Sequence, residues 1–382
     1  MTDHHVIVLG AGAAGLAATA ALTRAENVRV TLVAHTGETP SIRMHITGVA
    51  FGPTLPHTIH APLPAVPLLD DTAVHIDAAA RTVTLSSGTL LRYDTLLIAT
   101  GSHPRALDPH TPGVGHPAVV QRVTTLHSLD DAEKIRERLQ HAGTPTRVAI
   151  YGGGFTGAEV ASSLRDRGHH VALISRARIP GQSAFGPTLA ARIAATHRAR
   201  ITSFPGRTIA ALHPREDSVG IILDDTTLLS ADLLIVALGT DPTGPSPFTR
   251  GVDVDDRHRA RIAHIYAAGA AATHHDHHLG TWHIDHWADA AAQGAHAAAA
   301  LLHDHTGQPD PGPYRPRSAY GALIHGTAIT GIGYTPTAEE RSLPGPDLVI
   351  EHTLHGALVG VVAVDAVTAA YQRAERLHGV LT

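Results

Sequence analysis

The chain has 382 residues, of which 43% are hydrophobic and 16% are charged, a balance typical of a globular protein with about two or three domains. It contains no cysteine, which excludes disulfides, thiol nucleophiles and zinc–thiolate sites. Its formal charge of −5 does not indicate a nucleic-acid-binding surface. No apolar run reaches the roughly 18 residues of a membrane span. The first residues lack the features of a signal peptide, so we expect a cytoplasmic protein.

The first 33 residues predict a βαβ unit. An apolar run at 5–9 is typical of a strand, an alanine-rich helix extends to about Arg24, and residues 28–33 form the next strand. The loop between strand and helix has the glycine spacing of a dinucleotide-binding turn, in which amide groups at the helix N-terminus bind a pyrophosphate. The candidate contacts in this loop are Gly10, Gly12, Ala13, Ala14 and Gly15.

A second unit of the same kind starts near residue 147. Residues 147–151 predict a strand, about 158–167 a helix and 171–174 another strand. The candidate contacts in its loop are Gly152, Gly154, Phe155, Thr156 and Gly157. One glycine fingerprint is a weak indication, but two complete units in one chain are a strong one. The alternative is two glycine-rich turns that bind nothing. Two dinucleotides in one protein indicate electron transfer between nicotinamide and flavin rings.

Further segments fit an α/β plan. Short strands at 83–85 and 90–93 flank a turn, and a strand at 95–98 ends in Ala99, Thr100 and Gly101. Two more apolar strands, at 231–238 and 265–268, end in Gly239 and Gly269. After about residue 312 the pattern changes to alternating runs at 348–353 and 357–364, followed by a helix at about 366–377. This part predicts a small α+β domain built on a hairpin.

With these motifs the chain resembles the FAD-dependent pyridine-nucleotide reductases, and in particular their ferredoxin-reductase branch, which serves oxygenase and cytochrome P450 systems. The matching stretches, besides the two glycine loops, are Tyr93–Ser102, Leu126–Ala132, Ile265–Gly269, Asp285–Trp287, Gln293–Gly294 and Leu358–Val364. The resemblance implies an α/β fold with two Rossmann-like domains and a small α+β C-terminal domain. The FAD domain would be discontinuous, at 1–115 and 243–311, with the NAD(P) domain inserted at 116–242 and the last domain at 312–382.

The resemblance also implies an FAD-dependent NAD(P)H oxidoreductase, which passes hydride from NADPH to FAD and electrons on to an acceptor. The acceptor could be a ferredoxin, a quinone, oxygen or a small organic substrate. The absence of cysteine excludes a disulfide within the chain as acceptor. Two alternatives stay open: a repurposed member of the family in specialised metabolism, with atypical or lost flavin chemistry, and a non-catalytic nucleotide-binding protein. An oligomer is also possible.

On the FAD side several polar contacts implied by the resemblance are altered. Thr36 stands where the family has an acidic residue for the adenosine ribose, and Glu38 is close enough to replace it. Arg43 keeps the family's arginine and is expected to pair with the pyrophosphate. Gly48 stands in place of the family's lysine near the flavin, and Ala270, after Gly269, in place of an aspartate that holds the ribityl chain.

On the nicotinamide side, Glu159 matches a family glutamate that borders the nicotinamide. Ser175, Arg176 and Arg178 follow the strand that would carry an acidic residue in an NADH-binding protein. Because guanidinium groups pair with phosphate oxygens, these residues favour NADPH, although surface arginines on an ordinary loop are the simpler alternative.

Three further residues are candidate catalytic groups. The resemblance places His286 and Trp287 at the edge of the flavin and His45 on its other side. The histidine-rich stretch at 273–278 is interpreted as a solvated loop, and no metal site is expected.

Overall fold

The computed structural model describes residues 3–35, 40–142, 145–276, 279–335 and 339–378. By its internal contacts the chain divides into two units, which we call unit 1 (residues 1–44, 59–103 and 240–318) and unit 2 (residues 45–58, 104–239 and 319–382). Within the described ranges, none of the helices has the length and apolar character needed to cross a membrane. The division into three domains with the boundaries given above stays a prediction.

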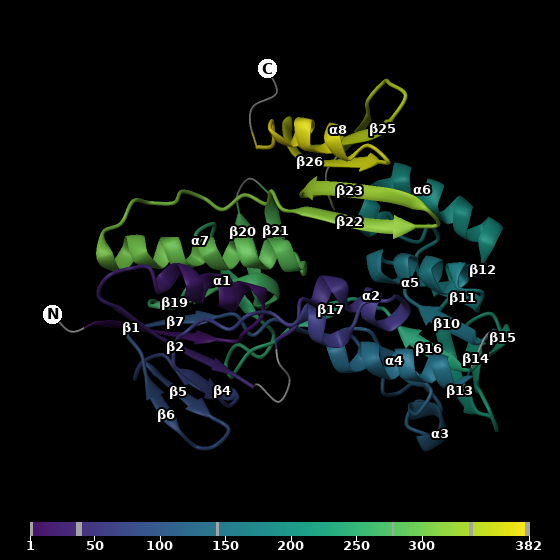
Figure 1. Ribbon diagram of the computed structural model, residues 1–382, viewed down its shortest axis with the longest axis horizontal. Coiled ribbons are helices and arrows are strands. Elements are labelled where there is room, and N and C mark those ends of the chain that lie inside the picture. Colours follow the sequence, from purple (N-terminus) through teal and green to yellow (C-terminus); the bar gives the residue numbers. More distant parts are fainter. Residues whose placement is uncertain (1–2, 36–39, 143–144, 277–278, 336–338, 379–382) are drawn as a thin grey trace. The chain divides into compact units, whose positions relative to one another are not determined.

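Unit 1 is built on a five-stranded parallel sheet in the order β19-β7-β1-β2-β3. Its strands are β1 (His4–Leu9), β2 (Val28–Ala34), β3 (Leu68–Asp70), β7 (Thr95–Ile98) and β19 (Ile265–Ala267). The last four residues of β1 are all buried, as expected for a strand covered on both faces. The helices α1 (Ala13–Leu22) and α7 (Trp287–Thr306) lie side by side along the sheet (Figure 1).

Smaller elements complete unit 1. One three-stranded sheet contains β4 (Ala73–Asp77), β5 (Thr82–Leu85) and β6 (Leu90–Arg92). Another contains β18 (Val252–Val254), β20 (Ala272–Asp276) and β21 (Gly280–Trp282). Unit 1 also contains β17 (Thr240–Pro242) and η3 (Gly269–Ala271), while η1 (Arg43–His45), η2 (Pro56–Ile59) and β8 (Ser102–Pro104) include residues of both units. Apart from η3, these stand where the chain passes between the units.

The histidine-rich stretch is not a solvated loop where the structure describes it, so that interpretation was wrong. Residues 272–276 form strand β20, in which His274 is fully buried and stacks on Trp282 with ring centroids 3.8 Å apart. Asp276 is also buried and pairs with Arg315. Stacking on an indole and pairing with an arginine make these polar side chains compatible with a buried position. Residues 277–278 lie outside the described residues.

Unit 2 repeats the Rossmann-like plan with a parallel sheet in the order β12-β11-β10-β16-β9. Its strands are β9 (Val123–Thr125), β10 (Arg147–Tyr151), β11 (His170–Ser175), β12 (Thr202–Pro205) and β16 (Leu233–Val236). Its helices are α2 (Ile46–Phe51), α3 (Pro117–Val120), α4 (Leu129–Ala142), α5 (Phe155–Asp166) and α6 (Gln182–Arg200). An antiparallel sheet of β13 (Ile209–Pro214), β14 (Val219–Leu223) and β15 (Leu228–Ala231) packs alongside.

The C-terminal part of unit 2 is a five-stranded antiparallel sheet with one short helix. The sheet has the order β22-β23-β26-β25-β24. The elements are β22 (Ala319–Ile324), β23 (Thr327–Gly333), β24 (Glu339–Ser342), β25 (Leu348–Leu354), β26 (Ala357–Val364) and α8 (Val367–Ala374). The predicted hairpin and helix are therefore confirmed, and the hairpin is the pair β25–β26.

Most predicted elements of the two βαβ units are confirmed within a few residues. Helix α5 begins at Phe155, three residues before the predicted start. Helix α6 was not predicted. Its first turn is broken at Gly186, with φ of 75° and Pro187 next, which interrupts the helical pattern in the sequence. The Glu340 carboxylate of β24 accepts a hydrogen bond from the Thr188 amide (3.0 Å) and so caps the second half of α6.

Candidate active site

The loop between β1 and α1 is shaped by three glycines with different tasks. Gly10 has φ of 104°, and a Cβ there would lie 2.3 Å from the Ala99 carbonyl oxygen. A Cβ on Gly15 would lie 1.8 Å from the Gly10 carbonyl oxygen. A Cβ on Gly12, in contrast, would meet no protein atom within 4 Å. Close packing of the backbone therefore requires glycine at positions 10 and 15. Glycine at position 12 instead leaves the space next to the loop free for a ligand.

The loop between β10 and α5 in unit 2 repeats this arrangement. Gly152 has φ of 129°, and a Cβ there would lie 2.0 Å from the Ala237 carbonyl oxygen. A Cβ on Gly157 would lie 1.9 Å from the Gly152 carbonyl oxygen, and one on Gly154 would meet nothing within 4 Å. Each unit therefore has an open cradle at a helix N-terminus, where amide groups and the helix dipole favour a pyrophosphate. The residues of both cradles fit a dinucleotide.

Segments from distant parts of unit 1 meet beside the first cradle. A Cβ on Gly269 would lie 2.9 Å from the Ala14 side chain, and one on Gly294 would lie 2.1 Å from the Ala14 carbonyl oxygen. The Ala99 amide donates to the carbonyl of Leu9, at the end of β1 (2.8 Å). The predicted stretches 99–101 and 269–270 and the start of α7 therefore surround the loop in which Gly12 lies.

A carboxylate that was not singled out from the sequence lies at this place. Asp285, just before α7, accepts hydrogen bonds at Oδ2 from Ser102 Oγ (2.7 Å) and Thr240 Oγ1 (2.6 Å). The Arg43 guanidinium lies 3.8 Å from its Oδ1. Thr100 donates to the Thr243 carbonyl (2.5 Å), which ties the two hydroxyl-bearing segments together. The predicted pyrophosphate ligand Arg43 is therefore held at an acidic group beside the cradle.

A buried network of polar side chains connects the first turns of α7 to the neighbouring segments of unit 1. Gln293 Oε1 accepts hydrogen bonds from the Gly269 amide (2.9 Å) and from His274 Nε2 (3.1 Å). Gln293 Nε2 donates to Asp289 (2.7 Å), which also accepts from the Tyr314 hydroxyl (2.8 Å). Burial raises the pKa of Asp289, while Gln293 and Tyr314 act in the opposite direction. These bonds satisfy groups that would be costly to leave unpaired and hold Gly269 in its position.

The two candidates for the adenosine ribose, Thr36 and Glu38, lie outside the described residues. Gly48 lies in the short helix α2 of unit 2, and Ala270 is buried in η3 of unit 1.

In unit 2 the strand end that was expected to read a 2′-phosphate lies next to the second cradle. A Cβ on Gly153 would lie 2.6 Å from Ser175 Oγ. Ser175 is buried and donates to the Ala177 carbonyl (3.2 Å), so its hydroxyl already serves its own loop. Arg176 and Arg178 are exposed. The two arginines, rather than the serine, are therefore available to a nucleotide.

The first turn of α5 is fixed by aromatic packing. The Phe155 ring lies 5.4 Å from that of Phe185 and 6.0 Å from that of Tyr320. Thr156 follows in the same turn. At the same edge of the sheet, Gly239 follows the carboxyl end of β16, which pairs in parallel with β10. It has φ of 85°, and its carbonyl accepts a hydrogen bond from the Arg105 amide (2.9 Å).

Glu159, on α5, has an uncharged hydroxyl as its partner. Thr47 of α2 donates to its carboxylate, and burial raises its pKa to about 7 against this bond. Helix α2 is held by Arg136 of α4, which donates to the carbonyls of Gly52 (2.9 Å) and Thr54 (2.6 Å). With glycine at position 48, one residue from Thr47, the partner that α2 offers to Glu159 is a hydroxyl. A carboxyl with a pKa near neutrality can hold or release a proton at physiological pH.

The other three catalytic candidates are divided between the units. His286 is the N-terminal cap residue of α7 in unit 1, and Trp287 is the first residue of that helix. Burial lowers the pKa of His286, while Asp289 and Asp285 raise it. His45 is exposed and precedes α2 in unit 2. The structure thus places His286 and Trp287 with Asp285 and Arg43, and Glu159 with Thr47.

Glu159→Gln is expected to stabilise the nucleotide-free protein at pH 8 and to change little at pH 4. The carboxyl ionises near 4.5 when unfolded and near 7 when folded. Its contribution to stability is therefore full below 4.5 and is lost as the pH rises through 7. For a partly exposed group we expect about 2 kcal/mol at pH 8. Thermal unfolding from pH 4 to 8 measures this, and the exposed variant Glu137→Gln is the control. Equal shifts for both variants would contradict the assignment.

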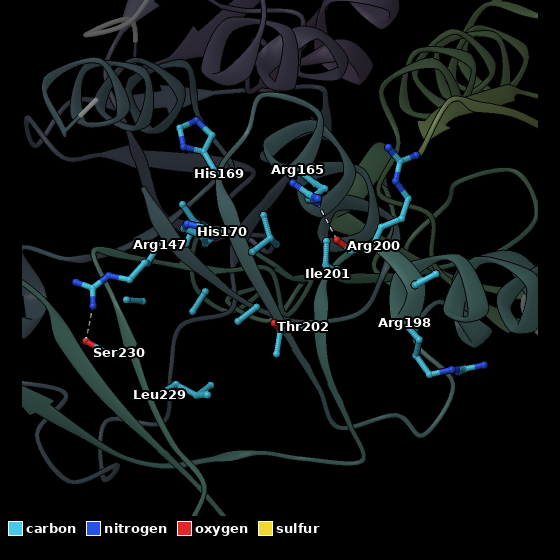
Figure 2. A pocket seen from close by; sticks show the side chains of 16 residues that line it. Arg147, Arg165, His169, His170, Arg198, Arg200, Ile201, Thr202, Leu229 and Ser230 are labelled. Atoms are coloured by element: carbon cyan, nitrogen blue, oxygen red, sulfur yellow. Dashed lines mark hydrogen bonds between the residues drawn. The ribbon is translucent and has the colours of Figure 1, made fainter. Parts of the chain in front are cut away.

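A pocket of about 560 Å³ lies at the opposite, amino-terminal ends of β10 and β11 (Figure 2). Its arginines are largely occupied by the protein itself: Arg147 pairs with Asp232 (2.5 Å), and Arg165 donates to the Arg200 carbonyl (2.8 Å). It also lies away from the glycine loop, which follows the carboxyl end of β10. This pocket is therefore not the nucleotide site.

The sequence indicated the glycine loops but not the roles of Asp285, Thr47, Arg136 or Gln293. Asp285 stands in a stretch that matches the family, and this match was the indication in the sequence that the residue belongs to the site. Its partners come from three other segments, and no spacing in the sequence relates them.

Two dinucleotide cradles, each on its own Rossmann-like unit, define a two-nucleotide flavoprotein oxidoreductase. A family model described as pyridine nucleotide-disulphide oxidoreductase matches residues 4–294. The chain belongs to this family, and the predicted class, an FAD-dependent NAD(P)H oxidoreductase, is confirmed.

Among curated proteins, the chain is 29% identical over 330 residues to the ferredoxin reductase component of the chlorobenzene dioxygenase of Cupriavidus sp. (strain PS12), covering 80% of this chain and 76% of that protein. It is 30% identical over 299 residues to the ferredoxin–NAD(+) reductase component of the anthranilate 1,2-dioxygenase system of Burkholderia cepacia, covering 76% and 71%. These relatives confirm the resemblance to the ferredoxin-reductase branch.

Solved structures show the same fold. A ferredoxin reductase from Rhodopseudomonas palustris has a TM-score of 0.83 at 24% identity, covering 97% of this chain and 94% of that chain. A covalent complex of putidaredoxin reductase with putidaredoxin has a TM-score of 0.84 at 22% identity, covering 98% and 93%. The predicted α/β class, with two Rossmann-like units, is thereby confirmed.

Proposed function

We propose that this protein takes electrons from NADPH and passes them, through FAD, to a ferredoxin. The pair of open glycine cradles carries the proposal, since Gly12 and Gly154 are the two fingerprint positions where a side chain would meet no protein atom. Relatives named as ferredoxin reductase components support the acceptor. We further propose that the protein acts in the cytoplasm.

The residues of the chain would bind the two nucleotides, orient their rings and shield them from water. A bound FAD would supply the redox chemistry, namely acceptance of a hydride from the nicotinamide and release of single electrons to the acceptor. The amides at the start of α1 would hold its pyrophosphate, with Arg43 as the cationic partner. The amides at the start of α5 would hold the pyrophosphate of NADPH. Glu159, with its pKa raised to about 7, would hold or release a proton at its carboxyl group on the nicotinamide side.

His286 and Trp287 are proposed to serve on the flavin side. His286 begins α7 beside Asp285 and carries a pKa lowered by burial, so its ring is neutral at physiological pH and offers one donor and one acceptor. Trp287 would cover an aromatic ring by packing. His45, exposed just before α2, is proposed to serve on the other side of the flavin.

The choice of NADPH over NADH is proposed to depend on Arg176 and Arg178, which are exposed next to the second cradle. Arg176→Ala should weaken NADPH binding about tenfold, because a charged hydrogen bond to the 2′-phosphate is lost, and leave NADH within about twofold. Titration with each nucleotide measures this. Arg207→Ala is the control, since Arg207 already pairs with Asp225 (2.8 Å). An equal effect of Arg176→Ala on both nucleotides would refute the phosphate assignment.

The absorption spectrum of the purified protein tests the function directly. The proposal expects a yellow protein, or an apoprotein that becomes yellow with FAD, whose visible absorbance NADPH bleaches without oxygen. Added ferredoxin of an aromatic-ring dioxygenase system should then restore the absorbance, while a quinone or a small organic acceptor should do so more slowly. A protein that binds FAD but that NADPH cannot bleach would contradict the reductase function.

A further inference from the structure

The part of the first cradle that would hold the flavin side of FAD needs hydrogen-bond acceptors, and the residue at position 270 has none in its side chain. Between pyrophosphate and ring, FAD carries a chain of hydroxyl groups, and such groups need acceptors when they leave water. Ala270, which is 6% exposed, offers no side-chain acceptor. Asp289, on the adjacent helix, is only 2% exposed and is bonded to Gln293 and Tyr314.

Asp285 lies on a segment that touches position 270 directly. His283, two residues before it, donates a hydrogen bond from Nε2 to the Ala270 carbonyl (3.1 Å). The neighbouring Gly269 packs against Ala14 in the first turn of α1, at the cradle itself. Position 270, the cradle and the segment 283–285 are therefore adjacent in one unit, so a carboxylate at 285 can serve the space next to residue 270.

The Asp285 side chain is held in one orientation by its neighbours, unlike a free charge on the surface. Ser102 and Thr240, from segments far apart in the sequence, both donate to its Oδ2 (2.7 and 2.6 Å). Arg43, the expected pyrophosphate ligand, lies 3.8 Å from its Oδ1. The carboxylate still has 21% of its side chain exposed. Two hydroxyl donors fix the orientation of a group that reaches the surface of the site, and such preorganisation serves a ligand.

We propose that Asp285 accepts hydrogen bonds from the ribityl hydroxyls of FAD and so replaces the carboxylate that is absent at position 270. The assignment rests on the proposed function, since it requires FAD in the first cradle. Ser102 and Thr240 are positioning residues that hold the carboxylate in place.

Binding of FAD and of ADP to the apoprotein tests the assignment. ADP has the adenosine and the pyrophosphate of FAD but neither the ribityl chain nor the ring. Asp285→Asn, which has the same shape without the charge, should weaken FAD about ten- to hundredfold and leave ADP within about twofold. Thr240→Val should give the same pattern with a smaller loss, about three- to tenfold, and conserves the shape of the side chain.

The control is Asp304→Asn, at the other end of α7, where Asp304 accepts from Arg259 (2.7 Å) and Tyr266 (2.5 Å). It should leave both affinities unchanged. If Asp285→Asn weakens FAD and ADP equally, Asp285 acts through Arg43 and the pyrophosphate, and the assignment is overturned. Unchanged FAD affinity in both Asp285→Asn and Thr240→Val overturns it as well. A wild-type apoprotein that binds ADP but not FAD would instead overturn the proposed function.

Discussion

Gly12→Val is expected to leave the protein folded and to reduce its affinity for FAD by at least about a thousandfold, or about 4 kcal/mol. Gly12 has φ of −75°, which any residue adopts, and a Cβ there would meet no protein atom within 4 Å. The isopropyl group would instead occupy the space of the pyrophosphate and cover the amides that bind it. Titration of the apoprotein with FAD, followed by flavin fluorescence, measures the loss.

The same change in the second loop should separate the two cofactors. Gly154→Val is expected to abolish NADPH binding and to keep FAD, because Gly154 has the same open surroundings in unit 2. Gly115→Val, in an exposed loop with nothing within 4 Å of its Cβ, is the control and should keep both. Normal FAD affinity in the Gly12 variant would show that the first cradle does not hold the flavin nucleotide.

Acidification from pH 7 to pH 4 is expected to destabilise the protein by several kcal/mol, about 3 for each of His274 and His197. Burial lowers the pKa of His274 to about 4, with Gln293 opposing it, and the pKa of His197 to about 4, with His325 adding to the effect. The pKa of His258 lies well below its usual value, because burial and then His274 and His296 disfavour its charged form.

Acid destabilises the protein because the unfolded chain takes up protons at these histidines more readily than the folded chain does. His274 and His197 bind protons near 6.5 when unfolded but only near 4 when folded, and burial lowers the pKa of His258 well below 6.5. Their contribution to stability is therefore complete above pH 6.5 and is lost as the pH falls towards 4. Since proteins are stable by about 5–15 kcal/mol, these groups remove a large part of the stability in mild acid.

Thermal unfolding midpoints between pH 4 and pH 7.5 measure this effect. His274→Phe keeps the stacking on Trp282 but has no titratable ring, so its unfolding should depend less steeply on pH. His275→Phe is the matched control on the same strand, because His275 is exposed and pairs with Asp253 (2.9 Å). If the two variants follow the same pH curve, the buried imidazoles are not the cause.

The amino-acid sequence by itself determined the two βαβ units and their open glycine positions. This is because strand, glycine turn and helix are contiguous, and their apolar runs and φ requirements act over short distances. The C-terminal hairpin was predicted for the same reason.

Only the tertiary structure decided which polar groups work together. Asp285 receives its donors from positions 102 and 240 and its cation from position 43, and no local pattern relates these segments. The stretch that contains His274 is polar enough to predict a solvated loop, yet stacking on Trp282 and a bond to Gln293 bury it. Burial of a polar side chain depends on partners that folding supplies from distant segments, so a local pattern cannot reveal it.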